Sequence, residues 1–434
     1  MVEDQNTRIL GYIDDVCSQI KFREVHREIK LELKAHIQDI VDEYLSEGLS
    51  EKEAVSKAIN QMGSSDDVGK QLNRIHKPRP EWSILSLCLL FMGLGLLAMY
   101  FIERQALFTA FPLHIFSKSL AFIIIGAGIA AGLYLFDYRK LEPYSRQMYL
   151  CTIAAMFLVV IFGQNYNGRL HLGVGPIYID IVEISPLLLS IALAGILNKW
   201  AWGRPKNLLQ GLLLCVAPLV LILASHSFST GIIYSVTCIT IMMVSGAGRK
   251  YSLLLTGLIA AVIMLPIISA PYRLQRLVTF IDPEKDLSGS GWLYMQLSKL
   301  TGGSGLWGQG LTLKPEFIPG LHTDFVFSYI TFTFGWIAGG VLAALAVIFI
   351  IRLARIATTV KSSYARLLVS GFAAILAVQF TWNILMNLGF APITGVGLPF
   401  ISYGGSQLIF NAAAVGVISS VYRRRNISKT LINS

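Results

Sequence analysis

Long apolar stretches alternate with short polar segments over most of this chain. A helix rises about 1.5 Å per residue, so about 20 apolar residues cross the roughly 30 Å hydrocarbon layer of a bilayer. We predict ten such spans, at residues 82–102, 114–136, 147–163, 177–197, 207–225, 229–246, 251–270, 324–351, 365–388 and 402–421. A content of 54% hydrophobic and 14% charged residues, with a mean hydropathy of +0.59, excludes an ordinary soluble globule. The pattern predicts an all-α, polytopic membrane protein.

The first 80 residues follow a different pattern, with apolar positions at helical spacing among many charged residues. Ser50 and Glu53 form a capping box that predicts a helix over 51–62, and Gly63 ends it. This segment resembles a small helical prefix domain found before some bacterial membrane proteins and anti-sigma-type regulators. We predict a prefix domain at 1–80, a membrane domain at 81–425 and a tail at 426–434. The acids of the prefix are a solvated helix face or, alternatively, a docking surface for a cytoplasmic partner.

Basic residues are concentrated in alternate loops. They follow the second, fourth, sixth, eighth and tenth predicted spans, for example at Arg139, Lys199, Arg249, Arg352 and Arg423. Positive charge marks the cytoplasmic side of a membrane protein, so we expect both termini to be cytoplasmic. This asymmetry and attraction to anionic lipid explain the net charge of +10, and we expect no nucleic-acid partner.

One outward segment, residues 271–323, is much longer than the others, and long ordered loops are usually functional. Arg273 and Arg276 lie near its start, where guanidinium groups can pair with phosphates or anchor the chain to lipid headgroups. Its many glycines allow tight turns or close approach to a ligand. Asp324 stands where this segment enters the next apolar span. A carboxylate at a membrane boundary is costly unless it is paired, hydrated or functional.

Four sequence blocks resemble signatures of the SEDS family (shape, elongation, division and sporulation), which includes FtsW, RodA and SpoVE. The blocks are PYRLQRLVTFIDPEKDLSGSGW, GLWGQGL, HTDFVF and GVGLPFISYGGSQLI, and they occur in the family's order and spacing. The resemblance implies a peptidoglycan glycosyltransferase of the bacterial cytoplasmic membrane. Such an enzyme polymerises lipid II at the outer face, together with a class B penicillin-binding protein, in division, shape or sporulation.

The family's catalytic aspartate falls on Asp324. A carboxylate there can take the proton of an attacking sugar hydroxyl, and partial desolvation would raise its pKa toward the working range. The resemblance also adds Gln296 and Glu316, which orient substrate or a divalent cation or form hydrogen bonds within the loop. His322 either tunes the aspartate or caps the following helix through Thr323.

Two further candidates lie outside this loop. Glu183 matches a family glutamate inside a predicted span, and an acid there is a functional candidate by default. Ser402 and Tyr403 belong to GVGLPFISYGGSQ, residues 395–407. The glycines of this block predict a broken helix that lines a groove for the lipid carrier or, alternatively, packs closely against other helices.

Several positions depart from the family pattern. Phe332 and Thr333 stand where the family has two glutamates, and Pro186 stands where a basic residue follows Glu183 by one turn. The family's glutamate, serine and proline are replaced at Gly320, Leu297 and Gly397. Two other interpretations therefore stay open: a catalytically weak homologue that acts as a scaffold or regulator, and a transporter of lipid-linked precursor.

Overall fold

The computed structural model describes residues 2–75, 77, 80–105, 114–166, 168–174, 177–286, 289–312 and 318–425. The chain divides into two compact units, one formed by residues 1–80 with 423–434 and the other by residues 81–422. Each unit has its own buried apolar core.

The first unit is a small helical domain. Its four helices are α1 (Val2–Ser18), α2 (His26–Ser46), α3 (Glu51–Met62) and α4 (Ser65–Ile75). The predicted capping box is present, because the Ser50 side chain faces the backbone of Glu53 and the Glu53 carboxylate accepts from the Ser50 backbone. Gly63 ends α3 with a φ of +87°, a conformation that favours glycine.

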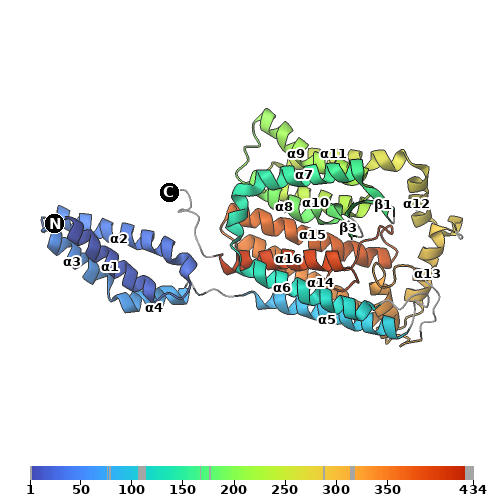
Figure 1. Cartoon of the computed structure of the whole chain (residues 1–434), viewed down its shortest axis with the longest axis horizontal. Coiled ribbons are helices and arrows are strands. Elements are labelled where there is room, and N and C mark those ends of the chain that lie inside the picture. Colours follow the sequence, from blue (N-terminus) through green and yellow to red (C-terminus); the bar gives the residue numbers. More distant parts are fainter. Residues whose placement is uncertain are drawn as a thin grey trace. The chain divides into compact units, whose positions relative to one another are not determined.

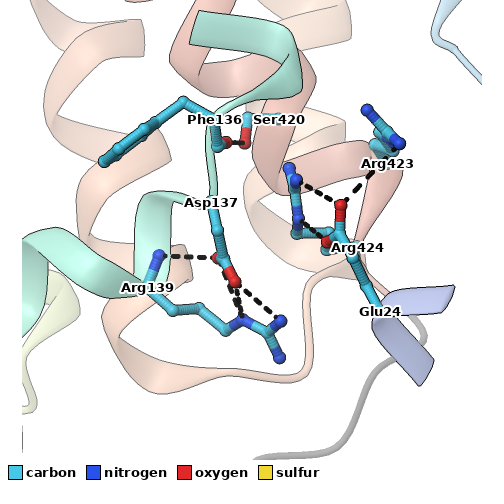
Figure 2. A network of polar contacts seen from close by, with 7 residues as sticks. All are labelled: Glu24, Phe136, Asp137, Arg139, Ser420, Arg423 and Arg424. Carbon is cyan, nitrogen blue, oxygen red and sulfur yellow. Dashed lines mark hydrogen bonds and ion pairs between the residues drawn. The ribbon is translucent and has the colours of Figure 1, made fainter. Parts of the chain in front are cut away.

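An arginine–glutamate cluster belongs to the first unit (Figure 2). The Glu24 carboxylate accepts hydrogen bonds from the Arg424 guanidinium, and the Arg423 guanidinium lies 3.7 Å from the same carboxylate. Arg424 is only 2% exposed. A buried arginine needs such a partner. One of the basic residues that follow the last predicted span is therefore directed to a carboxylate rather than to lipid.

The second unit is a bundle of apolar helices (Figure 1). Eight described helices are long and apolar enough to cross a membrane, and α8 and α10 are shorter apolar helices. The ten predicted spans correspond to α5 (Trp82–Arg104), α6 (Ile115–Leu135), α7 (Ser145–Phe162), α8 (Ile181–Ile196), α9 (Pro205–Ala224), α10 (Phe228–Val244), α11 (Arg249–Ile268), α14 (Val326–Thr359), α15 (Ser363–Asn387) and α16 (Gly405–Arg423). The fold class is therefore as predicted.

Helix α15 lies in the middle of this bundle, packed against α8, α10 and α14 (Figure 1). Its central side chains, such as Leu368, Phe372 and Phe380, are completely buried. By contrast, α11 exposes leucines such as Leu253 and Leu265, which are 72% and 71% exposed. Apolar side chains on the outside of a membrane bundle face lipid, so α15 is a core helix and α11 a peripheral one.

A short antiparallel sheet precedes α8 and was not predicted. Its strands are β1 (Gln164–Tyr166), β2 (Arg169–Val174) and β3 (Ile177–Ile179), in the order β1-β2-β3. The predicted fourth span started at residue 177, but the helix begins only at Ile181, after β3. Gly168 turns the chain between β1 and β2 with a φ of +80°. The Asn-Gly pair at 167–168 was the signal for this hairpin.

Helix α14 is interrupted at Gly335, whose φ is +89° and ψ is 170°. The glycine-rich loop at 305–310 supplies hydrogen bonds to the interrupted turn. The Gln309 and Gly310 amides donate to the carbonyls of Phe332 and Thr333, at 2.8 and 3.1 Å, and the Trp336 amide donates to the Gly305 carbonyl at 3.0 Å. An irregular backbone at membrane depth persists only where protein satisfies it. The glycine-rich loop thus forms backbone hydrogen bonds with α14 at this break.

The prediction of a broken helix at 395–407 is wrong, because most of this block is not helical. Residues 388–404 are irregular chain between α15 and α16, and α16 is a regular helix from Gly405. Close packing in this block is real: a Cβ added to Gly405 would lie 2.5 Å from the Phe122 ring of α6. At the other end of the bundle, the Ser420 hydroxyl of α16 donates to the Phe136 carbonyl that follows α6 (Figure 2).

The long segment at 271–323 is partly helical. It contains α12 (Pro271–Ile281), a short 3-10 turn at Pro283–Asp286 and α13 (Ser290–Gly302). The Tyr294 hydroxyl of α13 accepts a hydrogen bond of 2.9 Å from the Ile393 amide. This contact holds α13 against the irregular chain that follows α15.

Candidate active site

A tight turn just before α14 positions Asp324. The amides of Thr323, Asp324 and Phe325 all donate to the Gly320 carbonyl, at 3.0, 2.8 and 3.1 Å. Gly320 has a φ of +79°, which explains why a glycine occupies this position here. The Thr323 hydroxyl also donates to the Gly320 carbonyl, and α14 has no side-chain cap. The alternative in which Thr323 caps this helix is therefore wrong.

Two asparagines of α15 hold the Asp324 backbone. Asn383 Nδ2 donates to the Asp324 carbonyl at 2.9 Å and to the Val396 carbonyl at 2.7 Å. Asn387 Nδ2 donates to the same Asp324 carbonyl at 3.0 Å, while its Oδ1 accepts from the Ser328 hydroxyl. Sequence reasoning missed this pair. Two amides four residues apart in an apolar span were the signal, because buried amides need partners.

The Asp324 carboxylate lies beside an arginine that the sequence prediction did not include. A Cβ added to Gly395 would lie 3.6 Å from Asp324 Oδ2 and 3.3 Å from Arg169 Nη2. Arg169, the first residue of β2, donates to the Ser229 hydroxyl at 2.9 Å and to the Gly395 carbonyl at 3.5 Å. Gly395 itself has a φ of +70°. Gly395 thus lies between the Asp324 carboxylate and the Arg169 guanidinium.

Burial raises the pKa of Asp324 to about 6, and the Arg169 guanidinium opposes that rise. Desolvation disfavours the charged carboxylate, whereas a nearby cation favours it. The net pKa shows that desolvation is the larger effect. A carboxyl with a pKa near 6 is mostly ionised at neutral pH and is basic enough to accept a proton.

Glu183 lies on the first turn of α8 and faces the same region. Its Oε2 accepts a hydrogen bond of 2.8 Å from the Ser406 hydroxyl of α16. Asp180 caps α8 by accepting from the Glu183 amide, and its Oδ2 also lies 3.3 Å from His171 Nε2 of β2. The hairpin is therefore tied to the start of α8 through the contact of His171 with Asp180, and Asp180 has a structural role.

Arg169 and Glu183 line one cavity, which holds about 580 Å³ of empty space including its open mouth. The hairpin, α8, α10, α15, α16 and the irregular chain before α16 contribute its walls. The lining residues are Arg169, Glu183, Pro186, Leu187, Ser229, Thr230, Ile233, Ile375, Gln379, Gly395, Val396, Gln407, Phe410, Asn411 and Ala414. Pro186 stands where a basic residue is expected, and Arg169 of β2 provides a positive charge in the same cavity instead.

His322 and Tyr403 lie together beside the Asp324 turn. Their ring centroids are 5.5 Å apart, and the Tyr403 amide donates to the His322 carbonyl at 2.9 Å. Burial lowers the pKa of His322, so its ring is mainly neutral at pH 7. The Ser402 hydroxyl accepts from the Leu398 amide at 2.7 Å. The contacts of Ser402 and Tyr403 hold the irregular chain in place.

The remaining predicted residues lie on the long segment. Arg273 of α12 donates to the Tyr272 hydroxyl and the Pro266 carbonyl, and its guanidinium lies 4.6 Å from the Phe228 ring centroid. Arg276 follows on the same helix, and Gln296 lies on α13. These three residues are not among those that line the cavity. Glu316 falls outside the described residues.

No metal site emerges from the part of the chain that the structure describes. Within it, no three His, Cys, Asp or Glu side chains lie together in a way that could hold a metal ion. The divalent cation suggested by the sequence resemblance stays a prediction.

Replacing Arg169 by glutamine should move the pH dependence of activity upward. The guanidinium lowers the pKa of Asp324, so its loss should raise that pKa above about 6. We expect the acid limb of the pH profile of kcat/KM to move to a pH about one unit higher, because a neighbouring opposite charge lowers a carboxyl pKa by about one unit or more. Arg169→Lys keeps the charge and should shift the limb less. An acid limb that stays in place or moves downward in Arg169→Gln would contradict this electrostatic coupling.

The fold and the site together define a polytopic membrane protein with a buried carboxyl group beside a polar cavity within its helical bundle. The family model described as "Cell cycle protein", named for FtsW, RodA and SpoVE, matches residues 81–427. The chain therefore belongs to the FtsW, RodA and SpoVE family.

Similar proteins agree with this membership. The chain is 31% identical over 350 residues to the "Probable peptidoglycan glycosyltransferase FtsW" of Coxiella burnetii, covering 77% of this chain and 93% of that protein. It is 27% identical to "Stage V sporulation protein E" of Bacillus subtilis, covering 80% and 98%. A solved structure described as "Structural coordination of polymerization and crosslinking by a peptidoglycan synthase complex" has a TM-score of 0.67 at 24% identity, covering 80% of this chain and 99% of that one. The structural match supports the shared fold.

Proposed function

We propose that this protein is a peptidoglycan glycosyltransferase in which Asp324 is the general base. Its relatives carry that name, and the reaction belongs to cell-wall synthesis. The observation that supports the base assignment is the environment of Asp324. Its carboxylate is desolvated, has a pKa of about 6 and lies beside Arg169, while two asparagines hold the backbone carbonyl of the same residue.

The proposed reaction joins two sugars. A hydroxyl of the acceptor sugar attacks the anomeric carbon of a donor linked to an isoprenoid pyrophosphate, and Asp324 accepts the hydroxyl proton. The new glycosidic bond forms as the bond from the anomeric carbon to the pyrophosphate oxygen breaks. The electrons of that bond leave with the pyrophosphate, so charge is conserved. Lipid II is the donor that fits this chemistry.

Arg169 is the residue that we propose to stabilise the leaving pyrophosphate. Guanidinium groups match phosphate oxygens in bidentate geometry, and a fixed cation where negative charge develops lowers the barrier. Arg169 lines the cavity, whereas Arg273 is not among the residues that line it. Arg273 and Arg276 would then contact phosphates at the membrane surface.

We also propose that the site faces outward and that both termini are cytoplasmic, as the alternation of basic loops predicts. A class B penicillin-binding protein is the proposed partner, because polymerised glycan must be cross-linked. The similar solved structure is described as a synthase complex that coordinates polymerisation and crosslinking, which supports such a partner. The prefix domain remains a proposed docking element for a cytoplasmic partner.

Polymerisation by purified protein tests this function. The full chain, with its penicillin-binding partner, is incubated with lipid II and the glycan products are separated on a gel. We expect polymer from the native chain and almost none from Asp324→Ala. Equal polymer from both proteins would refute the assignment of the base. No polymer from either, combined with a wall defect in cells that lack the protein, would support the scaffold interpretation instead.

A further inference from the structure

Two amide side chains that line the cavity carry buried polar atoms. Gln379 of α15 and Asn411 of α16 are only 7% and 3% exposed, and both line the cavity. In the described part of the chain, no protein group hydrogen-bonds to Gln379 Oε1 or to Asn411 Nδ2. Buried polar atoms are nearly always paired, and exceptions need an explanation. The pair offers one acceptor and one donor to a ligand.

The position of these amides connects them with the reaction site. Gln379 lies about two helical turns before Asn387, the last residue of α15, which contacts Asp324. Asn411 lies about two helical turns after Gly405, the first residue of α16. Arg169, Glu183 and Gln407 line the same cavity closer to those ends. Asp324 is not itself among the residues that line the cavity, but Arg169 and Gly395, which lie beside its carboxylate, are. The cavity therefore runs from the neighbourhood of Asp324 to an inner part with neutral hydrogen-bonding groups.

The inner part suits one chemical group particularly well. We propose that Gln379 and Asn411 bind the acetamido group of an N-acetylated sugar and so select the glycan that enters the cavity. An acetamido carbonyl accepts from Asn411 Nδ2, and its N–H donates to Gln379 Oε1. Its methyl group fits the apolar wall formed by Ile233, Ile375 and Ala414. An isoprenoid chain offers neither a donor nor an acceptor, and the ionised pyrophosphate diester of the donor offers acceptors only. This inference rests on the proposed function, because it concerns substrate in the same cavity.

Leucine replacements separate binding from folding. In Gln379→Leu and Asn411→Leu, the side chain keeps a similar size but loses its polar atoms. We expect the KM for lipid II to rise at least tenfold in each, with a small change in kcat and no fall in the thermal midpoint, since an unpaired buried polar group does not stabilise the fold. Ser419→Ala is the matched control. Ser419 lies on α16, is buried and has an oxygen without a described partner, but it does not line the cavity, so its KM should not change.

A direct binding measurement keeps this inference separate from the catalytic proposal. Saturation-transfer NMR on the detergent-solubilised full chain uses N,N′-diacetylchitobiose as the probe and cellobiose as its comparison without acetyl groups. We expect transfer to the acetyl methyl protons in the native chain, loss of that signal in the double leucine variant, and no comparable signal for cellobiose.

The outcomes of the two experiments are distinct. An unchanged KM in both leucine variants, equal methyl signals in native and double variant, or a lowered thermal midpoint that accounts for the lost activity would overturn the role of the amides. If the native chain makes no polymer but still gives the methyl signal, and the variants lose it, the catalytic proposal fails and the binding inference holds.

Discussion

Replacing Asp324 with asparagine is expected to reduce lipid II polymerisation about 10²–10⁴-fold, the usual contribution of a general base. Asparagine keeps the size of the side chain and leaves the Asp324 backbone carbonyl available to Asn383 and Asn387. Only the proton acceptor is removed, so kcat should fall much more than substrate binding. Asp14→Asn is a suitable control, because Asp14 is an exposed partner of Lys30 in the first unit, outside the site.

The native chain should also lose activity as the pH falls through about 6. The base works only when ionised, and burial has raised the pKa of Asp324 from 3.8 to about 6. An ordinary aspartate would lose its charge only near pH 4. The measurement is kcat/KM against pH for the native chain, in which the acid limb reports the free enzyme. A limb near pH 4 would show that Asp324 is not desolvated in solution or is not the base.

The same raised pKa has a consequence for stability. A carboxyl whose pKa is higher in the folded state binds more protons there than in the unfolded state between about pH 4 and 6, so its contribution to stability falls as the pH rises through that range. At neutral pH the ionised, desolvated carboxylate is therefore destabilising. Asp324→Asn should be at least as heat-stable as the native chain, and a clearly lowered thermal midpoint would indicate a structural role.

Replacing Gly335 with alanine is expected to destabilise the membrane unit by about 2–6 kcal/mol. A non-glycine residue at positive φ costs about 1–3 kcal/mol, and forcing atoms into filled space costs a similar amount. Gly335 has a φ of +89°, and an added Cβ would lie 2.1 Å from the Leu306 carbonyl oxygen and 2.5 Å from the Gly308 amide. The substitution would push the 305–310 loop away from the break in α14 and leave the Phe332 and Thr333 carbonyls without their hydrogen bonds.

Gly340→Ala is the matched control for this prediction. It lies in the regular part of the same helix, and an added Cβ would meet no atom within 4 Å. Alanine is a better helix former than glycine, so Gly340→Ala should be neutral or slightly stabilising. The two variants are compared by heating detergent-solubilised protein and measuring the fraction that stays folded by size-exclusion chromatography. Equal thermal midpoints would mean that the break in α14 tolerates a side chain.

The amino-acid sequence alone determined the class of protein and the position of its candidate base. Hydropathy is a local property, and a span needs only a sufficient run of apolar residues, so all ten apolar helices were predicted. The capping box at Ser50 and Glu53 is equally local. The HTDF block identified Asp324 because its resemblance to the family lies in a short, contiguous motif.

The tertiary structure decided what surrounds that base. Arg169 lies 226 positions from Gly395, and Asn383 lies 59 positions from Asp324, so no periodicity or spacing could place them together. The break in α14 at Gly335 likewise depends on hydrogen bonds from a loop that precedes it by about 30 residues. A buried charged or polar group is stable only with partners, and those partners come from whichever elements the fold brings near. Local pattern therefore predicted the helices and the aspartate, while packing brought the arginine, the asparagines and the nearby cavity to this candidate site.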